Sequence, residues 1–296
     1  MHENSKPSEI SVIIPAFNEG EIIGSVVRRV REVLDAYGQT YEILVIDDGS
    51  SDQTAAEAES AGAIVYAHPY KIGNGAAVKS GIRQARGTIL VMMDGDGQHR
   101  PEDLPKLLQG LETYDMVVGA RTGKSKTSLH RNFANMLYNA FAGYVCGRRI
   151  HDLTSGFRAI KASIARNLLP LLPNTFSYPT TMTLAVVRSG YSLLYVHIET
   201  EKRIGKSKIK LLSDGTRFLL VLFKIATLYS PMKIFLPVSV STFLLGLGYG
   251  LFKIFFMDSR YGPTSAMLIT VSILMFLIGL VSEQVAQLRF DRNNRD

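Results

Sequence analysis

Two long stretches without a formal charge lie near the C-terminus of this 296-residue chain and restrict what it can fold into. The first, between Lys233 and Lys253, has 19 residues, and the second, between Arg260 and Glu283, has 22. Each is close to the about 20 residues that a helix needs to cross a bilayer. Two buried core helices are the alternative, but so apolar a pair would need a large surrounding domain that the remaining chain cannot supply. We therefore expect two transmembrane helices.

The connection between the two stretches is short, so the helices, over about residues 234–256 and 262–284, should form a hairpin with both flanks on one side of the membrane. Positive charges are more numerous outside this hairpin than in its connection, which favours a cytoplasmic N-terminal domain and tail. The first residues, MHENSKPSE, contain no apolar core of a signal peptide. We expect a cell-membrane protein whose N-terminal domain faces the cytoplasm.

Three parts of the chain follow from this division. Residues 1–210 should form a separate domain, and residues 233–296 should contain the two spans and a tail. Residues 211–232 have the pattern of an amphipathic helix at the membrane interface, with Arg217 and Lys224 able to reach lipid headgroups. A packed helix of the preceding domain is the alternative for that segment.

The N-terminal domain shows short, continuous apolar runs, which are typical of strands buried on both faces. These runs are ISVII (10–14), YEILVI (41–46), AIVY (63–66), TILVMM (88–93) and DMVVG (115–119). Helical patterns lie between them: apolar residues recur at helical spacing from Ile22 to Leu34, and Gly38 follows as a stop. Alternating strands and helices predict an α/β fold with a largely parallel sheet and right-handed crossovers.

Composition narrows the chemistry only slightly. The single cysteine, Cys146, cannot form an intramolecular disulfide or a thiolate zinc cluster. A net charge of +7 suggests an acidic partner such as a phosphorylated substrate or an anionic lipid surface. Nucleic acid would also fit the charge, but no recognition module for it is visible, and we expect no nucleic-acid partner.

Polar residues follow the predicted strands at the edge where ligands of such sheets bind. Asp94, Asp96 and Gln98, in DGDGQH, are the sharpest signal, because Mg²⁺ or Mn²⁺ prefers oxygen ligands and a cation that bridges phosphates needs few from the protein. Alternate residues of an extended chain point the same way, so these three side chains should converge. Asp47 and Asp48, in DDGSSD, could recognise a nucleobase or ribose, although helix capping is the simpler alternative.

Two further elements could bind phosphate. The glycines of KIGNGAAVKSG precede a predicted helix N-terminus and could form a phosphate cradle, although the motif is a weak one. Basic side chains follow the fifth strand and recur in RIGKSK; they include Arg121, Lys124, Lys126, His130, Arg131, Lys202, Arg203, Lys206 and Lys208. A solvated basic face is the alternative for the residues after the fifth strand, and a contact with anionic lipid is the alternative for RIGKSK.

Taken in order, PAFNE, DDGSSDQT, GNGAAVKSG, DGDGQH, VVGAR, DLTSGFR and GKSK, ahead of an apolar hairpin, resemble the polyprenyl-phosphate branch of the family 2 glycosyltransferases, of the dolichol-phosphate mannose synthase type. The similarity covers residues 10–210. It implies a GT-A fold and transfer of a sugar from a nucleotide-sugar donor to a polyprenyl phosphate, dolichyl or undecaprenyl. UDP and GDP donors both remain open.

The resemblance also implies roles for individual residues. Asp96 and Gln98 would hold Mg²⁺ or Mn²⁺ on the donor diphosphate, Asp94 would hold the ribose or sugar, and Arg121 and Arg131 would grip the acceptor phosphate. The nucleotide-sugar pocket would be completed by Pro15, Phe17, Glu19, Ile46, Asp48, Gly95, Arg203 and Lys208. Relatives often place the arginine three residues before the glycine of GKSK, where this chain has Lys202, so either Lys202 or Arg203 could make that contact.

The expected chemistry is an in-line displacement with inversion. An acceptor phosphate is already an anion, so it can attack the anomeric carbon without a general base. A cation and basic side chains would stabilise the negative charge on the leaving diphosphate. Arg121 and Arg131 would hold the nucleophile in attack geometry.

Three alternatives remain. A processive polysaccharide synthase would need a QxxRW motif and more spans, and the chain has no tryptophan. A membrane-anchored transferase could use a sugar hydroxyl or another non-lipid acceptor, and a non-catalytic membrane scaffold could keep the fold. Gly246, Gly248 and Gly250 in the first span could allow close packing between protomers of a homo-oligomer.

Overall fold

A computed structural model of the chain shows two compact units. The first comprises residues 1–141 and 148–210, and the second comprises residues 142–147 and 211–296. The structure describes residues 9–121, 136, 139–141, 143–144, 147–175, 177–201, 227, 230–257 and 262–293. Of the predicted site residues, Arg131, Arg203 and Lys208 lie outside this described part of the chain. So does most of the segment 211–232, for which an interfacial helix is expected.

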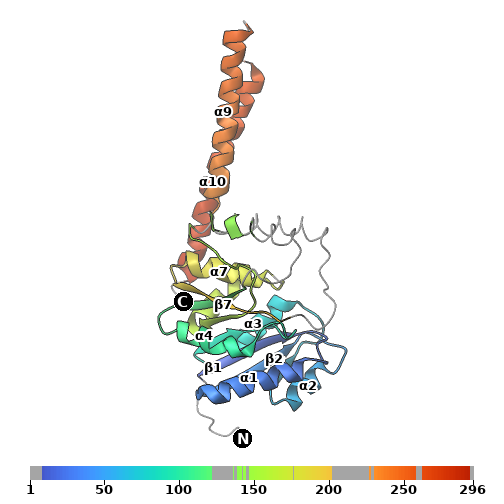
Figure 1. Cartoon of the computed structure of the whole chain (residues 1–296). Coiled ribbons are helices and arrows are strands. Elements are labelled where there is room, and N and C mark those ends of the chain that lie inside the picture. Colours follow the sequence, from blue (N-terminus) through green and yellow to red (C-terminus); the bar gives the residue numbers. More distant parts are fainter. Residues whose placement is uncertain are drawn as a thin grey trace. The chain divides into compact units, whose positions relative to one another are not determined.

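The first unit is built on a seven-stranded sheet of order β3-β2-β1-β4-β6-β5-β7 (Figure 1). All five predicted strands are present, and two more join them. The strands are β1 (Ile10–Ala16), β2 (Tyr41–Asp47), β3 (Ile64–Ala67), β4 (Ile89–Met92), β5 (Met116–Arg121), β6 (Arg158–Lys161) and β7 (Leu193–Ile198).

Strands β3, β2, β1 and β4 are mutually parallel, and β5 is parallel to β7. Strand β6 lies between β4 and β5 and runs antiparallel to both. The predicted mostly parallel sheet is therefore confirmed, with one reversed strand that the apolar pattern did not reveal. Because β6 is reversed, the loop that precedes it reaches the same sheet edge as the carboxyl ends of the parallel strands.

Helices cover both faces of this sheet, as alternation of side chains along β1 shows. Val12 and Ile14 are fully buried in a core shared with α1 and α4. Ile13 faces the opposite way and packs so closely on α3 that a Cβ at Gly81 would lie 2.3 Å from its Cγ2 atom. The helices of this unit are α1 (Ile23–Tyr37), α2 (Thr54–Ser60), α3 (Asn74–Gln84), α4 (Leu104–Gly110), α6 (Ala162–Leu168) and α7 (Tyr178–Arg188), with short 3₁₀ turns at Pro101–Asp103 and Leu169–Leu171.

Helix α1 illustrates how the sequence specifies these elements. Its buried residues recur at helical spacing, and the helix stops where Gly38 adopts the left-handed backbone with φ of 79°. An amide in that conformation closes the last turn, since the Gly38 N–H donates to the Leu34 carbonyl.

The second unit contains two long helices, α9 (Met232–Phe256) and α10 (Pro263–Asn293). Helix α9, and residues Pro263–Leu288 of α10, are long and apolar enough to cross a membrane, with mean hydropathies of 1.7 and 2.3. The two helices pack against each other as the predicted hairpin. At its base, the Glu283 carboxylate accepts a hydrogen bond from the Met232 N–H at 3.2 Å, which satisfies one free donor of the first turn of α9.

Glycines let the two helices of this hairpin approach closely. A Cβ at Gly246 would lie 2.9 Å from the Cβ of Leu268, and one at Gly279 would lie 2.6 Å from the Cβ of Phe235. Gly246 therefore makes room for α10 within one chain, and its expected role between protomers stays a prediction. Gly248, two residues on, meets nothing within 4 Å among the described residues.

Candidate active site

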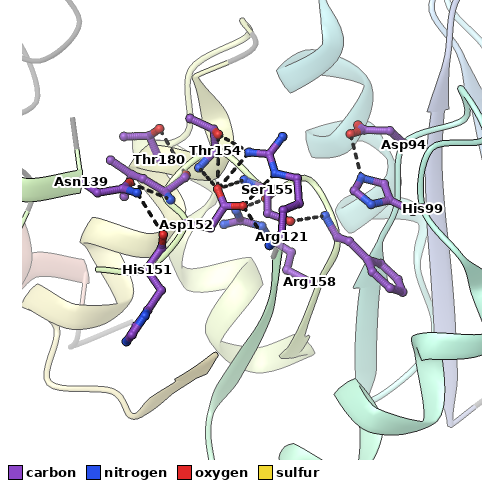
Figure 2. Close-up of polar contacts among 12 residues, drawn as sticks. Asp94, His99, Arg121, Asn139, His151, Asp152, Thr154, Ser155, Arg158 and Thr180 are labelled. Carbon is purple, nitrogen blue, oxygen red and sulfur yellow. Dashed lines mark hydrogen bonds and ion pairs between the residues drawn. The ribbon is translucent and has the colours of Figure 1, made fainter. Parts of the chain in front are cut away.

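The site lies at the edge of the sheet where β1, β2, β4 and β5 end, and the loop 152–157 before β6 adds to it. The sequence DLTSGF of this loop follows no parallel strand, yet the reversed β6 brings it beside the end of β5. Figure 2 shows side chains from β5, from the turn after β4 and from this loop gathered in one place.

Asp94 is hydrogen-bonded to a histidine for which the sequence predicted no role. His99 Nε2 lies 3.3 Å from Asp94 Oδ2, and the imidazole ring is 5% exposed and stacked on Phe157 at 5.3 Å between centroids. His99 Nδ1 is buried and has no hydrogen-bond partner among the described residues. His99 thus orients Asp94, and the stacking of the His99 ring on Phe157 holds that ring in place.

Gly156 provides the space that Asp94 occupies. A Cβ at this position would lie 2.4 Å from Asp94 Oδ2 and 2.9 Å from its Cγ. The loop backbone can therefore pass directly over the carboxylate only because residue 156 has no side chain.

Arg121, at the end of β5, is held by a two-pronged ion pair. Its Nε and Nη2 atoms donate to the two oxygens of Asp152 at 2.8 and 2.9 Å, and Nη2 also donates to Thr154 Oγ1 at 2.6 Å (Figure 2). Asp152 Oδ1 additionally accepts the backbone N–H groups of Thr154 and Ser155, each at 3.1 Å. Asp152 therefore fixes both the arginine and the loop.

Arg158 is a fully buried cation next to this pair. Its guanidinium donates to the carbonyl oxygens of Pro179, at 2.7 Å, and Ser155, and to Thr183 Oγ1 at 3.2 Å. Its Nε atom and the hydroxyl of Tyr178 both lack a partner among the described residues. A buried guanidinium that is bonded to neutral oxygens leaves its positive charge available to neighbouring anions.

These charges shift the pKa values of the cluster. Burial alone would raise the pKa of Asp94, but the His99 hydrogen bond and the charges of His99, Arg121 and Arg158 outweigh it and lower the pKa. Burial opposes ionisation of Asp152 in the same way, and the hydrogen-bonded Arg121 outweighs it and lowers the pKa. Burial lowers the pKa of Arg158. Both carboxylates are therefore ionised at neutral pH.

The segment after Asp94 is a turn rather than an extended chain. Gly97 has a φ of 71°, and the Asp96 carboxylate accepts the Gln98 N–H at 3.1 Å. The expectation that alternate extended residues align the three side chains is therefore wrong, because a left-handed glycine reverses the chain between them.

The donor set of this turn nevertheless fits a hard divalent cation. Asp96 and Gln98 are partly exposed and offer a carboxylate and an amide oxygen, the ligands that Mg²⁺ and Mn²⁺ prefer. No group of three or more His, Cys, Asp or Glu residues suited to a metal occurs in the described part of the chain. A cation held here would therefore need oxygens from its substrate, as a diphosphate would supply.

Asp48 has its carboxylate turned to the protein. Oδ1 lies 2.8 Å from His68 Nδ1 and accepts the Ile72 N–H at 2.9 Å, and Oδ2 accepts the Gly73 N–H at 2.8 Å. The residue is 3% exposed. Asp48 thus anchors the loop 68–73 rather than presenting a free carboxylate to a ligand.

That loop places a cation over an aromatic ring after β1. Lys71 Nζ lies 3.7 Å from the ring centroid of Phe17. The Glu19 N–H donates to Thr54 Oγ1 at 2.9 Å, so the β1–α1 loop is tied to the start of α2.

Three other residues predicted for the nucleotide-sugar pocket are buried. Pro15 is buried in β1, and Ile46 is fully buried in the sheet core, where its side chain has no exposed surface. Gly95 is buried where a Cβ would lie 3.2 Å from the Pro15 carbonyl oxygen.

The proposed phosphate cradle at the start of α3 is occupied by the protein itself. The Ala76 N–H donates to the Asn174 carbonyl at 3.2 Å, and Cβ atoms at Gly73 and Gly75 would lie 2.3 and 2.2 Å from the carbonyls of Asn174 and Pro173. These glycines make room for the loop before α7, which corrects the expectation of a phosphate there.

The structure brings four residues that the sequence predicts for the site, Asp94, Asp96, Gln98 and Arg121, to one edge of the sheet. His99, Asp152 and Arg158 had no predicted role, although all three lie in the motifs DGDGQH and DLTSGFR. The missing signal was topological, since a reversed strand cannot be distinguished from a parallel one by its apolar residues.

Comparison with known proteins identifies the class. Residues 11–169, more than half of the chain, match the glycosyl transferase family 2 model, and the chain belongs to this family. Residues 230–288 match a second model, the GtrB C-terminal hairpin. The expected family and the expected transmembrane-type hairpin are both confirmed.

Curated relatives include sugar transferases of polyprenyl phosphates. A dodecaprenyl-phosphate galacturonate synthase of Rhizobium johnstonii is 30% identical over 54% of this chain and 50% of its own length. An undecaprenyl-phosphate 4-deoxy-4-formamido-L-arabinose transferase of Proteus mirabilis is 32% identical over 59% of this chain and 58% of its own length. The chain thus spans half of the first relative and somewhat more than half of the second.

Solved structures confirm the GT-A fold. Glucosyl-3-phosphoglycerate synthase of Mycobacterium tuberculosis, solved with Mn²⁺, UDP-glucose and phosphoglyceric acid, aligns with a TM-score of 0.61 at 21% identity over 74% of this chain and 80% of that one. At this identity the likeness concerns the fold alone.

Proposed function

We propose that this protein transfers a sugar from a nucleotide-sugar donor to a polyprenyl phosphate at a membrane. The observation that carries the proposal is a family 2 site in which the charges of Arg121 and buried Arg158 favour the ionised form of Asp94, in a chain that also carries an apolar hairpin. Relatives named for dodecaprenyl and undecaprenyl phosphate support a lipid-phosphate acceptor. A UDP or a GDP donor is compatible with this site.

Asp96 and Gln98 are the residues that would hold Mg²⁺ or Mn²⁺, and such a cation supplies charge stabilisation for a leaving diphosphate. The mycobacterial neighbour, whose structure contains both Mn²⁺ and UDP-glucose, supports this choice of cofactor. Asp94, kept ionised and oriented by His99, would accept hydrogen bonds from hydroxyl groups of the donor.

Arg121 would position the acceptor phosphate. Asp152 uses two of its N–H groups, yet the guanidinium side chain is 38% exposed and can reach an anion on its open side. A phosphate oxygen is a nucleophile without deprotonation, so no carboxylate needs to act as a base. The positive charge of Arg158 behind the loop would lower the cost of bringing two anionic substrates together.

Asp48 would act on the donor through the loop that it anchors. Its three bonds to residues 68, 72 and 73 set the position of Lys71 over Phe17, where a nucleobase or a phosphate could bind. Arg131, Arg203 and Lys208 remain proposed phosphate contacts, and the cytoplasmic orientation of the site and homo-oligomer formation remain proposals as well.

The test is an assay of the full chain in detergent. The protein is incubated with Mg²⁺ or Mn²⁺, a short polyprenyl phosphate and a panel of UDP- and GDP-sugars, and glycosylated lipid is detected by mass spectrometry. We expect one donor to yield product and Asp96→Ala to lower its rate about 100-fold or more. Glu112→Ala, an exposed carboxylate on another part of the domain, serves as the control and should leave the rate unchanged.

Two results would contradict the proposal. Nucleotide binding without lipid product from any donor would point to a non-lipid acceptor. Absence of binding for both UDP and GDP would favour a non-catalytic membrane scaffold.

A further inference from the structure

The chain after β7 runs back along the end of the DGDGQH turn. The Glu201 N–H donates to the Gln98 carbonyl at 2.9 Å, and His99 forms an antiparallel bridge with Thr200. Residues 199–201 therefore lie directly against Gln98 and His99. Gln98 carries the amide of the candidate cation site, and His99 is the hydrogen-bond partner of Asp94.

Partly exposed ion pairs lie next to this backbone contact. Arg29, on α1, places Nη2 3.0 Å from each carboxylate oxygen of Glu102 and 3.1 Å from Glu201 Oε1. Arg100, next to His99, pairs with Glu199 at 2.8 Å. We refer to these five residues, Arg29, Arg100, Glu102, Glu199 and Glu201, as the clasp.

The clasp differs from isolated surface ion pairs in its geometry. An exposed pair contributes little, but a network built on a two-pronged arginine is the recognised exception. The hydrogen bonds that Arg29 donates to Glu201 and then to Glu102 raise its pKa, as expected for a guanidinium shared between two carboxylates. The network joins three segments, namely α1, the turn after His99 and the end of β7.

We propose that the clasp is a positioning device for Gln98 and His99. Its ion pairs would hold residues 199–201 against the backbone of Gln98 and His99. Phe157 and Asp94 contact the His99 ring. The catalytic consequence rests on the proposed function, because Gln98 would then be set for a divalent cation. Groups that orient metal ligands in this way commonly affect metal affinity strongly.

The test compares Arg29→Met with Lys161→Met. Methionine keeps an apolar stem while removing the charge. Lys161 forms a 2.8 Å ion pair with Asp115 in the same domain and is 44% exposed, against 35% for Arg29. Asp115 precedes β5, whose other end carries Arg121, so this control pair lies at the opposite edge of the sheet.

The first readout is the dissociation constant of Mn²⁺ with UDP or GDP bound, measured by electron paramagnetic resonance without acceptor. We expect Arg29→Met to weaken Mn²⁺ binding about tenfold, the lower end of the range for residues behind metal ligands. Glu201→Gln keeps part of the network and should weaken binding less, about threefold. Lys161→Met should stay within about twofold of the parent protein, since it lies outside that network. An unchanged affinity in Arg29→Met, or an equal loss in Lys161→Met, would overturn the proposal.

The second readout needs no ligand. Hydrogen exchange of the peptide that contains Gln98 and His99 should be faster in Arg29→Met than in the parent protein and unchanged in Lys161→Met. Failure of the parent protein to bind Mn²⁺ with either nucleotide would contradict the proposed function. The hydrogen-exchange comparison would still test whether the clasp positions Gln98 and His99. Unchanged exchange in Arg29→Met would overturn it.

Discussion

The two sides of the site hold their carboxylates in different ways. On the side of β1 and β2, Asp48 is bonded to backbone N–H groups and a histidine, and it anchors a loop. On the side of β4 and β5, Asp94 interacts with His99 and with the charges of Arg121 and Arg158, and Asp152 pairs with Arg121.

The two kinds of hydrogen-bond partner should have different effects on the site. Backbone donors hold a carboxylate without adding a net charge, so the Asp48 side should be rigid and insensitive to charge changes elsewhere. Guanidinium groups set both position and potential, so the Arg121 side should respond to charge substitutions in activity as well as in stability. Substitutions on the two sides should therefore have distinguishable signatures.

The largest effect is expected for Arg121→Met. It removes the cation proposed to position the acceptor phosphate and leaves Asp152 without its ion pair, so kcat/KM should fall about 100- to 1,000-fold. Arg121→Lys keeps a charge but loses the two-pronged geometry, and it should recover only part of the rate.

The control for this arginine is Arg166→Met, which removes a guanidinium that donates to the Ala85 carbonyl away from the site. Steady-state rates with the identified donor and acceptor provide the measurement. Equal losses in the two variants would mean that Arg121 acts only in folding.

A smaller effect, on stability, is expected for Asp152→Asn. The loss of the ion pair with Arg121 should lower the free energy of unfolding by about 1–3 kcal/mol at neutral pH. Because the pKa of Asp152 is lowered in the folded protein, this contribution is complete above the unfolded value of about 4 and disappears as the pH falls through the folded value.

Denaturant unfolding at several pH values measures this contribution. The difference between Asp152→Asn and the parent protein should be constant from pH 7 to about pH 5 and shrink below about pH 4. A difference that stays constant down to pH 3 would show that the charge of Asp152 is not what stabilises the loop.

On the side of β4 and β5, sequence patterns could predict some residues of the site better than others. Asp94, Asp96, Gln98 and Arg121 follow strands whose apolar runs are plain, so their shared edge follows from the parallel topology. Asp152 and Arg158 depend on β6, a four-residue strand inserted between β4 and β5 in the opposite direction. Strand order and direction depend on contacts distant in sequence, which a local pattern does not contain.

The structural roles of the glycines could be predicted only in part, for the same reason. Gly38 ends α1 as its place after an apolar helical pattern predicts. Gly73 and Gly75 resemble a phosphate-binding turn, yet they accommodate the backbone of residues 173–175, which lie about one hundred positions further along the chain. A glycine indicates close approach, but the sequence does not say of what.

The smallest effect is expected for Asp48→Asn, on the framework side. The amide offers one oxygen where the carboxylate offers two, so one of the backbone N–H groups of Ile72 and Gly73 would face an amide N–H group. Nucleotide affinity, measured by calorimetry, should fall about tenfold as the loop carrying Lys71 shifts, consistent with the cost of one unpaired buried donor.

Lys71→Ala should reproduce part of this loss of nucleotide affinity, since an exposed cation over Phe17 contributes about 0.5–1 kcal/mol. Charge neutralisation at Asp48 should leave the Mn²⁺ dependence of activity unchanged, whereas an altered dependence would show that the two sides of the site are electrostatically coupled.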